Sequence, residues 1–479
     1  MMLKSVNSRP VIKAAFMFLV LTAILGMLCF SKSVSAQVNF MNSLTPLLIV
    51  SGAAFLYTAY TAGDLLLTFS LTSLNAVGVA FQCMLPSDFA TIKQDMVSYP
   101  LLFSAFSILL IFCYDISQGG ERIQYIFGKL CSPLGLTIIA GTIVLSTVIL
   151  LVFSRGEDNK SWLRIPGVFQ IQLTEVFKVL LVVFFALLSK ANLDALPLKL
   201  LRSRFVWAEG VLILTIGCLG ILGEYGSIIL ITALAVGMTY LTFEKKRYAL
   251  YMLASIIALI GVGWLLLNMF GNAYANAVAN GQETGSLLKR IASANSRLNE
   301  RFALWTKGID DPALEEVSGQ LKDARRAAIK GGLTGNVHPV YVLYEESDYA
   351  FIGLLARCGI LVGAAVMMLF SIVLRQGLVI ASEQTDKAAS AIAAGMAMSI
   401  SFGFIINASS ASGLIPLAGL AAPFISRGGS NMLITYIASS ILIYLSGNRN
   451  SLLRSVVDAF KQPQEAPQPK AESINRITR

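Results

Sequence analysis

The sequence predicts an all-α polytopic membrane protein with about 12 transmembrane helices. Of its 479 residues, 56% are hydrophobic and only 13% are charged, whereas soluble domains carry about 25% charged residues. The mean hydropathy is +0.70. Apolar runs of about 20 residues, the length that crosses a hydrocarbon core, recur along most of the chain, and this repetition defines the class.

Twelve apolar runs mark the expected helices, with boundaries that are good to a few residues. They are residues 11–30, 44–62, 65–85, 98–114, 135–154, 173–190, 207–222, 226–242, 249–270, 349–373, 388–408 and 431–446. A long polar segment, residues 271–347, separates the ninth run from the tenth, and its Glu315–Lys330 stretch has the pattern of an amphipathic helix. Residues 448–479 are polar and contain three prolines, which predicts a disordered tail.

Basic residues predict the orientation, because they collect in cytoplasmic loops. With the N-terminus inside, the inner segments hold twenty Lys and Arg residues, and the short outer loops hold six. Those six are Lys32, Lys93, Arg155, Lys160, Arg164 and Arg427. Both termini are therefore expected in the cytoplasm, and residues 271–347 outside. This asymmetry also explains the net charge of +10 without nucleic acid as a partner.

The N-terminus leaves one alternative open. Three basic residues precede the first apolar run, and Val34-Ser35-Ala36 resembles a signal-peptidase site, so the first helix is either a retained span or a cleaved signal. The six cysteines form no CxxC pair and His338 is the only histidine, so we expect neither a disulfide framework nor a metal site.

Charged residues that enter a membrane are costly and tend to be functional. A first candidate segment, Gln172-Leu-Thr-Glu175-Val-Phe-Lys178, opens the sixth helix at the outer side. Glu175 and Lys178 are three residues apart and so share a helix face. The alternative is an ordinary helix start, with an acid in its first turn that its own lysine neutralises.

A second candidate segment, Gly413–Ser430, breaks an apolar stretch with two prolines and four glycines. Such backbone at membrane depth is either buried in protein or lines a polar cavity. Its last residues, Ser426, Arg427, Gly428, Gly429 and Ser430, lead into the final helix and are typical of a phosphate cradle. The alternative is a re-entrant turn whose arginine reaches the membrane surface.

A third candidate segment, Leu343–Gly353, places three acids before the apolar tenth run. A carboxylate beside an apolar wall can have a raised pKa, which suits a general base, and Asp348 is our candidate. The alternative is a helix cap made by Ser347 or Asp348.

These segments resemble, in order, the motifs of the SEDS family (shape, elongation, division and sporulation), which includes FtsW, RodA and SpoVE. The similar stretches are Trp162-Leu163-Arg164 with Gln172 to Lys178, Gly223-Glu-Tyr-Gly226, Gly331-Gly-Leu-Thr-Gly335, Ser347-Asp348-Tyr-Ala-Phe351, and Gly413 to Ser430 with Asn407 upstream; Lys93-Gln94 resembles a further family pair. The family core has ten helices, which implies a core in residues 65–447 and an added N-terminal hairpin in residues 1–64.

Members of this family polymerise lipid II, a lipid-linked disaccharide, into peptidoglycan. The resemblance implies that Asp348 takes the proton from the 4-hydroxyl of the acceptor N-acetylglucosamine, whose oxygen attacks C1 of the donor N-acetylmuramic acid. Undecaprenyl diphosphate leaves, and the α donor linkage becomes β, so the reaction inverts without a second carboxylate as nucleophile.

Cations must stabilise the leaving diphosphate. The substrate-binding residues that we expect are Gln172, Glu175, Lys178, Arg301, Arg427, Ser426, Gly428, Gly429, Ser430, Arg164 and Arg297. No cofactor is required, although Mg²⁺ or Mn²⁺ at the diphosphate remains open. The expected partners are lipid II and a class B penicillin-binding protein that crosslinks the strands. The expected location is the bacterial cytoplasmic membrane, with a role in division, elongation or sporulation.

The chain also departs from the family pattern. Leu173 replaces a proline, and Ala356-Arg357 stands where the family has an acidic pair. Arg357 lies nine residues beyond Asp348, on the opposite helix face, so we expect it to pair elsewhere, with Glu224 as the candidate.

Three rival functions remain as alternatives to a glycosyltransferase. They are a lipid II flippase, a catalytically inactive scaffold of the cell-wall machinery, and a secondary transporter, which the absence of a sequence repeat disfavours.

Overall fold

The computed structural model describes residues 8–85, 132–153, 162–165, 169–194, 196–282, 285–308, 315–336 and 338–447. Eleven of the twelve expected runs are helices within these ranges. The run 98–114, the Lys93-Gln94 pair and the tail 448–479 lie outside the described residues. Ten helices in the described part are long and apolar enough to cross a membrane. A further helix, α8, is apolar along most of its length but carries three charges.

The helices of the described part are α1 (Ser8–Lys32), α2 (Val34–Thr61), α3 (Leu65–Cys83), α7 (Pro133–Phe153), α8 (Leu173–Lys190), the short 3₁₀ helix η2 (Lys199–Arg202), α9 (Arg204–Leu222), α10 (Tyr225–Phe243), α11 (Lys246–Ala279), α12 (Ser286–Lys307), α13 (Glu315–Gly331), α14 (Ala350–Glu383), α15 (Lys387–Ala411) and α16 (Gly429–Gly447). Two short strands, β1 (Trp162–Ile165) and β2 (Phe169–Gln172), pair antiparallel with Trp162 opposite Gln172.

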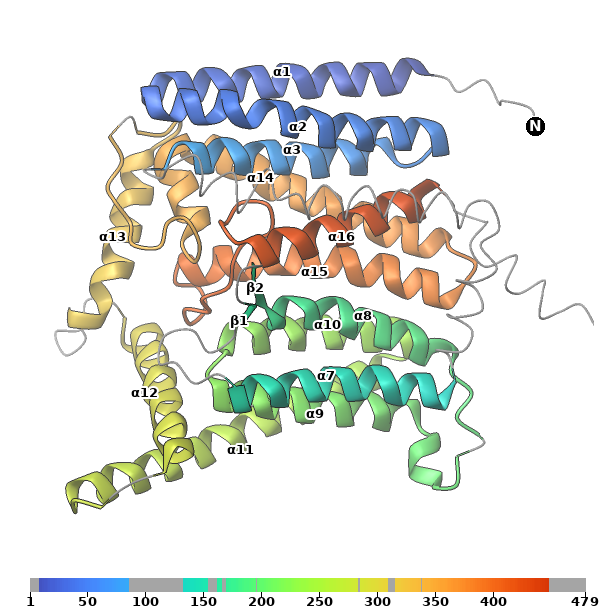
Figure 1. Cartoon of the computed structure of the whole chain (residues 1–479), viewed down its shortest axis with the longest axis vertical. Helices are drawn as coiled ribbons and strands as arrows, with labels where there is room; N and C mark the ends of the chain where they lie inside the picture. Colours follow the sequence, from blue (N-terminus) through green and yellow to red (C-terminus); the bar gives the residue numbers. More distant parts are fainter. Residues whose placement is uncertain are drawn as a thin grey trace, which may run out of the picture.

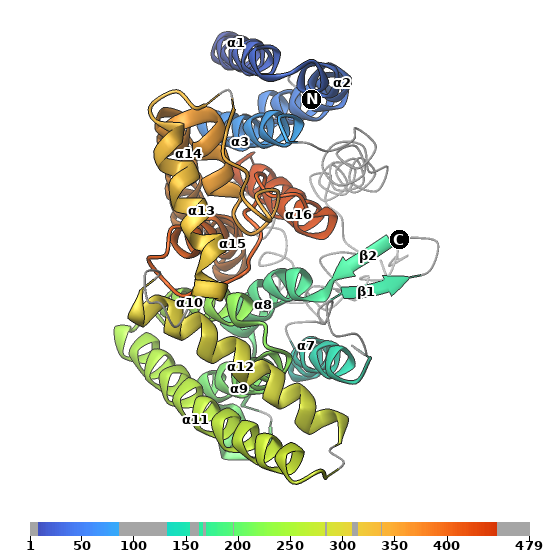
Figure 2. The same ribbon diagram turned by 90° about the vertical axis from the view of Figure 1, so that its left-hand side faces the viewer.

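The long apolar helices lie side by side, and α12 and α13 lie across one end of them (Figure 1). Figure 2 looks onto that end, where the start of α14 also lies. α14 packs along α15, α3 and α13, and α8 packs against α15, α10 and α7. Phe404 of α15 stacks on Phe370 with ring centroids 4.1 Å apart and meets Phe351 edge-on, so it fixes both halves of α14. The fold therefore gathers its polar segments at one end of an apolar bundle.

The N-terminal hairpin packs onto the rest of the bundle through α3. α1 and α2 contact each other and α3, and the Lys32 ammonium at the end of α1 donates to the carbonyl of Asn336 at 2.8 Å. The outer faces of the hairpin expose large apolar side chains such as Phe16, Met27 and Leu56, as expected for helices that face lipid. α1 is thus an integral part of the packed bundle.

The segment between α11 and α14 contains more helix than the sequence predicted. The amphipathic helix expected at Glu315–Lys330 is confirmed as α13. α11, however, continues to Ala279, nine residues beyond the expected run, and α12 was not predicted. α12 packs mainly against α11, and it lies across the end of the bundle (Figure 2).

A kink in α14 accommodates the glycine-rich turn that follows α13. Gly359 has φ +82° inside α14, a value that favours glycine. The backbone N–H groups of Ile360 and Leu361 donate to the carbonyls of Gly332 and Leu333. A side chain on Gly335 would begin 2.0 Å from the Arg357 carbonyl oxygen. The Gly331–Gly335 motif therefore allows two backbones to touch where α14 starts.

Candidate functional site

Asp348 lies in the turn formed by residues 343–349, which we call the Asp348 turn, directly before α14. The N-cap position of α14 falls on Tyr349, whose side chain makes no capping bond within the described residues. The structure therefore does not support the alternative in which Ser347 or Asp348 caps this helix. Instead, the turn packs against the loop of residues 412–428: the Arg427 N–H donates to the Glu346 carbonyl at 2.6 Å, and the Ser426 hydroxyl donates to the Ser347 carbonyl at 2.6 Å.

The Asp348 carboxylate and the Arg301 guanidinium approach the same glycine. Gly419 has φ +63°, and a side chain there would begin 3.5 Å from Asp348 Oδ2 and 3.6 Å from Arg301 Nη2. Arg301 comes from α12 and also donates from Nη1 to the Ala418 carbonyl at 3.4 Å. The missing side chain at Gly419 thus leaves room beside the Asp348 carboxylate and the Arg301 guanidinium, which come from segments far apart in the sequence.

Burial raises the pKa of Asp348, and the neighbouring Glu346 adds to the rise, while Arg301 and a hydrogen bond from Ser347 hold the pKa down. Burial likewise lowers the pKa of Arg301, and Asp348 opposes that effect. A carboxylate whose pKa is raised by burial, and which faces an arginine that opposes the rise, has the properties of a general base.

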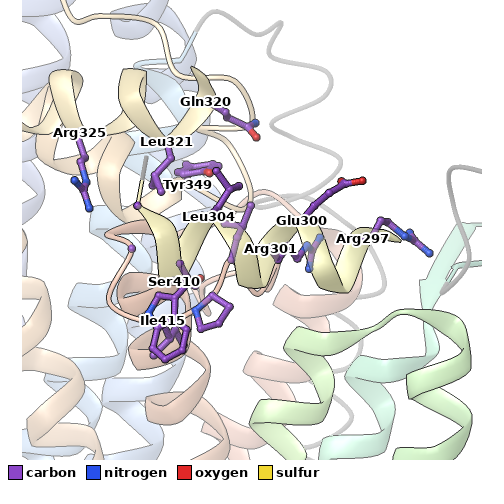
Figure 3. Close-up of a pocket in the computed structure, with 15 residues that line it drawn as sticks. Arg297, Glu300, Arg301, Leu304, Gln320, Leu321, Arg325, Tyr349, Ser410 and Ile415 are labelled. Atoms are coloured by element: carbon purple, nitrogen blue, oxygen red, sulfur yellow. The ribbon is translucent and has the colours of Figure 1, made fainter. Parts of the chain in front are cut away.

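A cavity of about 240 Å³ opens beside this pair, between α12, α13 and the 412–428 loop. Its lining includes Arg297 and Arg301 from α12 and Gln320 and Arg325 from α13 (Figure 3). The Tyr349 side chain, adjacent to Asp348, also lines it. Glu300 of α12 also lines the cavity, so its charged lining is three guanidinium groups and one carboxylate, and this excess of positive charge favours an anionic ligand. Arg297 and Arg301 were predicted from the sequence as binding residues, whereas Arg325 and Gln320 were not.

Arg297 contacts the Gly223-Glu-Tyr-Gly226 motif. A side chain on Gly223 would begin 2.8 Å from Arg297 Nη2, and the Tyr225 hydroxyl donates to the Ala294 carbonyl at 2.7 Å. A side chain on Gly226 would begin 2.4 Å from the Ala418 carbonyl oxygen. This motif, which resembles a family motif, therefore has a structural role: it packs the start of α10 against both α12 and the 412–428 loop.

Glu175 and Lys178 form an ion pair in the first turns of α8, with side chains only 2% and 5% exposed. The N–H of Gln172, the residue that precedes α8, donates to the Ser430 hydroxyl at 3.0 Å. Three residues before Ser430, the Arg427 N–H holds the Asp348 turn. The described residues thus connect this pair to Asp348 through the 412–428 loop and the start of α16.

The remaining predicted binding residues occupy separate places. Gly429 and Ser430 begin α16, and the Gly428 carbonyl accepts from the Met432 N–H at 2.9 Å. The Arg427 side chain is half-buried, and its Nε makes no hydrogen bond within the described part of the chain. Arg164 lies in β1 opposite Gln170, and its side chain is outside the described residues. A phosphate cradle at residues 426–430 remains a prediction.

Arg357 pairs with Glu345, so the expected partner Glu224 was wrong. Arg357 Nη2 lies 2.5 Å from Glu345 Oε1, and Nη1 donates to the Met84 carbonyl at 3.1 Å. The reason is the sharp Asp348 turn, which brings Glu345 beside the second helical turn of α14. The expectation that Arg357 pairs with a group other than Asp348 is confirmed. The first acid of the Asp348 turn therefore neutralises the unusual arginine, and the third faces Arg301 beside Gly419.

The fold and the site together define a polytopic membrane protein with a half-buried aspartate that faces an arginine, and with a cavity lined by arginines beside it, at one end of its bundle. The family model for FtsW, RodA and SpoVE, described as "Cell cycle protein", matches residues 70–451. The chain belongs to this FtsW/RodA/SpoVE family.

Two curated relatives illustrate the similarity. The chain is 25% identical over 372 residues to the peptidoglycan glycosyltransferase RodA of Mycobacterium tuberculosis strain H37Rv, covering 74% of this chain and 69% of that protein. It is 26% identical over 404 residues to the stage V sporulation protein E of Bacillus subtilis strain 168, covering 81% of this chain and 98% of that protein. A chain in the solved structure of a peptidoglycan synthase complex has the same fold, with a TM-score of 0.52 and 16% identity; the match covers 81% of this chain and 98% of that one.

Proposed function

We propose that the protein is an inverting peptidoglycan glycosyltransferase that polymerises lipid II at the outer leaflet of the bacterial cytoplasmic membrane. Membership of the family supports the reaction class. The observation that carries the residue assignment is the half-buried Asp348 carboxylate facing Arg301 beside an arginine-lined cavity.

Asp348 acts as the general base. It accepts the proton of the 4-hydroxyl on the acceptor N-acetylglucosamine, and that oxygen forms a bond to C1 of the donor N-acetylmuramic acid. The bond between C1 and the diphosphate oxygen breaks, and undecaprenyl diphosphate leaves with the electron pair. Attack from the face opposite the leaving group converts the α linkage to β. One base and one activated leaving group suffice for this displacement.

Arg301, Arg297 and Arg325 supply positive charge for the diphosphate. All three line one cavity, and charge that develops on a leaving group is stabilised best by preorganised donors in a water-poor site. The Arg427 side chain, with its buried Nε, is a fourth candidate. A divalent cation at the diphosphate is compatible with this assignment but is not part of it.

Glu175 and Lys178 support the same site from α8. Their buried ion pair keeps a lysine in place beside the start of α16 without leaving an unpaired charge. We assign Lys178 to the phosphate side of the substrate and Glu175 to the orientation of Lys178 or to contacts with sugar hydroxyls.

The orientation and the partner belong to the same proposal. The excess of basic residues in the expected inner segments places both termini in the cytoplasm and α12 and α13 outside. We assign a class B penicillin-binding protein as partner, because nascent glycan strands need crosslinking. The solved complex of similar fold coordinates polymerization and crosslinking, which supports this assignment.

Polymerisation of lipid II by the purified full-length chain, alone and with a partner transpeptidase, tests the proposal. Asp348→Asn keeps the shape of the side chain but removes the base, so we expect a loss of about 10²–10⁴-fold in rate with unchanged insertion and folding. Polymerisation by Asp348→Asn at the wild-type rate would eliminate Asp348 as the base. Lipid II translocation without polymerisation would support the flippase, and loss of both activities in the wild type would support the scaffold.

A further inference from the structure

Three successive carbonyl groups of the Asp348 turn accept hydrogen bonds from other parts of the fold. The Glu346 carbonyl accepts from Gln82 Nε2 of α3 at 3.1 Å, the Ser347 carbonyl accepts from the Ser426 hydroxyl, and the Asp348 carbonyl accepts from Asn407 Nδ2 of α15 at 3.0 Å. Carbonyl groups in a turn have no helix or sheet partner, so these bonds determine where the turn lies.

Each of the two amide side chains also holds a second carbonyl, in the 412–428 loop. Gln82 Nε2 donates to the Ile425 carbonyl at 2.9 Å, and Asn407 Nδ2 donates to the Leu420 carbonyl at 2.6 Å. A carboxamide nitrogen has two hydrogens, so each amide uses both, one for each segment. Gln82 and Asn407 are both 0% exposed. Two buried amides thus link the Asp348 turn to the loop at two separate points.

The Asn407 link sets the gap in which the proposed reaction takes place. Leu420 follows Gly419, whose open side faces Asp348 Oδ2 and Arg301 Nη2. The preceding Ala418 carbonyl accepts from Arg301 Nη1. Asn407 donates to both the Asp348 carbonyl and the Leu420 carbonyl. This one side chain therefore fixes the turn that contains the proposed base relative to the loop segment that binds the Arg301 guanidinium.

The Gln82 link rests on a close helix–loop contact. A side chain on Gly78, one helical turn before Gln82, would begin 1.9 Å from the Phe424 carbonyl oxygen. Phe424 itself has φ +63°, a conformation that costs about 1 kcal/mol or more in residues other than glycine. Glycine at position 78 therefore admits the loop, and Gln82, on the same face of α3, bonds the loop where it arrives.

We propose that Gln82 and Asn407 are positioning residues, which act through Asp348 by holding its turn against the 412–428 loop. This role rests on the proposed function. Neither amide carries a reacting charge. Each is required because a general base works only within a few tenths of an ångström of its productive position, and a misplacement of about 1 Å can cost on the order of 10²-fold in rate.

Lipid II polymerisation by the full-length protein tests this role with Gln82→Met and Asn407→Leu, which keep most of the volume and remove both donors. Gln376→Met is the matched control. Gln376 is also buried, and its Nε2 donates to the Asp64 carboxylate at 2.8 Å. Asp64 directly precedes α3, whereas Gln82 lies near the other end of α3, about 27 Å away at 1.5 Å per residue. The control loses an amide bond of similar burial far from the base.

We expect kcat to fall about 10²-fold in both site variants, with KM for lipid II unchanged within about twofold, and Gln376→Met to keep the wild-type kcat. Adding Gln82→Met to Asp348→Asn should cause no further loss, because residues that act through one group are not additive. A kcat that stays at the wild-type value, or a full additional loss in the double variant, would overturn the positioning role.

Ser426→Ala keeps the test decisive if Gln82→Met fails to fold. It removes one hydroxyl, the donor to the Ser347 carbonyl, and carries the same expected split between kcat and KM. Wild-type protein that does not polymerise lipid II would refute the proposed function. Active wild type with unaffected variants would refute only the positioning role.

Discussion

The Glu345–Arg357 ion pair predicts that its two partners are unequally replaceable. The side chains are 1% and 12% exposed, and the shortest N–O distance is 2.5 Å. Removing one partner of a buried pair costs about 3–5 kcal/mol of stability, because the other charge is left without a partner. A glutamate in that situation can take up a proton, whereas an arginine cannot lose one.

This difference gives a magnitude for Arg357→Leu. Burial already raises the pKa of Glu345, and Arg357 opposes the rise, so removal of the arginine raises the pKa of this carboxyl further and favours its protonated form in the folded protein. Protonating a carboxyl with an unfolded pKa of about 4.3 costs about 3.7 kcal/mol at pH 7 and about 1 kcal/mol at pH 5, at 1.36 kcal/mol per unit. The folded state then binds a proton that the unfolded state lacks, so stability rises as the pH falls. Arg357→Leu should therefore recover stability between pH 7 and pH 5, by at most about 2.7 kcal/mol, which is the limit for one proton over two pH units.

Equilibrium unfolding of the detergent-purified protein at both pH values, relative to wild type, measures this effect. Glu345→Leu should lose about 3–5 kcal/mol at both, because the remaining arginine stays charged. The double variant Glu345→Leu/Arg357→Leu should lose less than either single variant at pH 7, because no buried charge remains. Equal losses for both single variants at both pH values, or a double variant whose loss is the sum, would refute the reasoning.

Three further predictions concern topology and chemistry. A cysteine that replaces the exposed Arg326 of α13 should react with an impermeant reagent from outside the cell, and a cysteine that replaces Lys246 should not. Ser318 of the same helix is buried, so a cysteine there would not be a suitable probe. Labelling in the reverse pattern would invert the orientation. Glu175→Gln and Lys178→Met should each impair polymerisation, with the double variant no worse than the poorer single variant; independent losses would separate their roles. Arg301→Gln removes the group that holds the pKa of the catalytic carboxyl down, so the acidic limb of kcat/KM should shift to higher pH, because the base must be ionised; an unmoved limb would contradict the assignment of Asp348.

Most of the bundle could be predicted from hydropathy, because each membrane span needs about 20 consecutive apolar residues, and such a run is visible in the sequence without knowledge of the rest of the fold. α12 was missed for a different reason. It is polar on average, and its apolar positions, such as Ile291, Leu298 and Phe302, recur only every three or four residues. That periodicity predicts a helix, but it was applied only to α13. The error left the helix that carries Arg297 and Arg301 as unstructured loop.

The candidate site was predictable only where its residues are close in sequence. The motif around Asp348 and the Gly413–Ser430 segment are continuous, and the structure brings them into contact through Ser426 and Arg427. Gln82 and Arg325 gave no such signal. Each contributes through contacts between α3 or α13 and segments far along the chain, which one sequence without homologues does not reveal.

The three acids of the Asp348 turn have different environments, and that difference bears on whether the enzyme is active. Glu345 forms an ion pair with Arg357. The charge reversal at position 357 is therefore compensated by an acid three residues before Asp348, and Asp348 itself takes no part in that ion pair. Asp348 instead faces Arg301 across the space that Gly419 leaves open. The charge reversal at Arg357 is therefore compensated locally by Glu345, and the half-buried Asp348 that faces Arg301 beside Gly419 is what favours a working glycosyltransferase over an inactive scaffold.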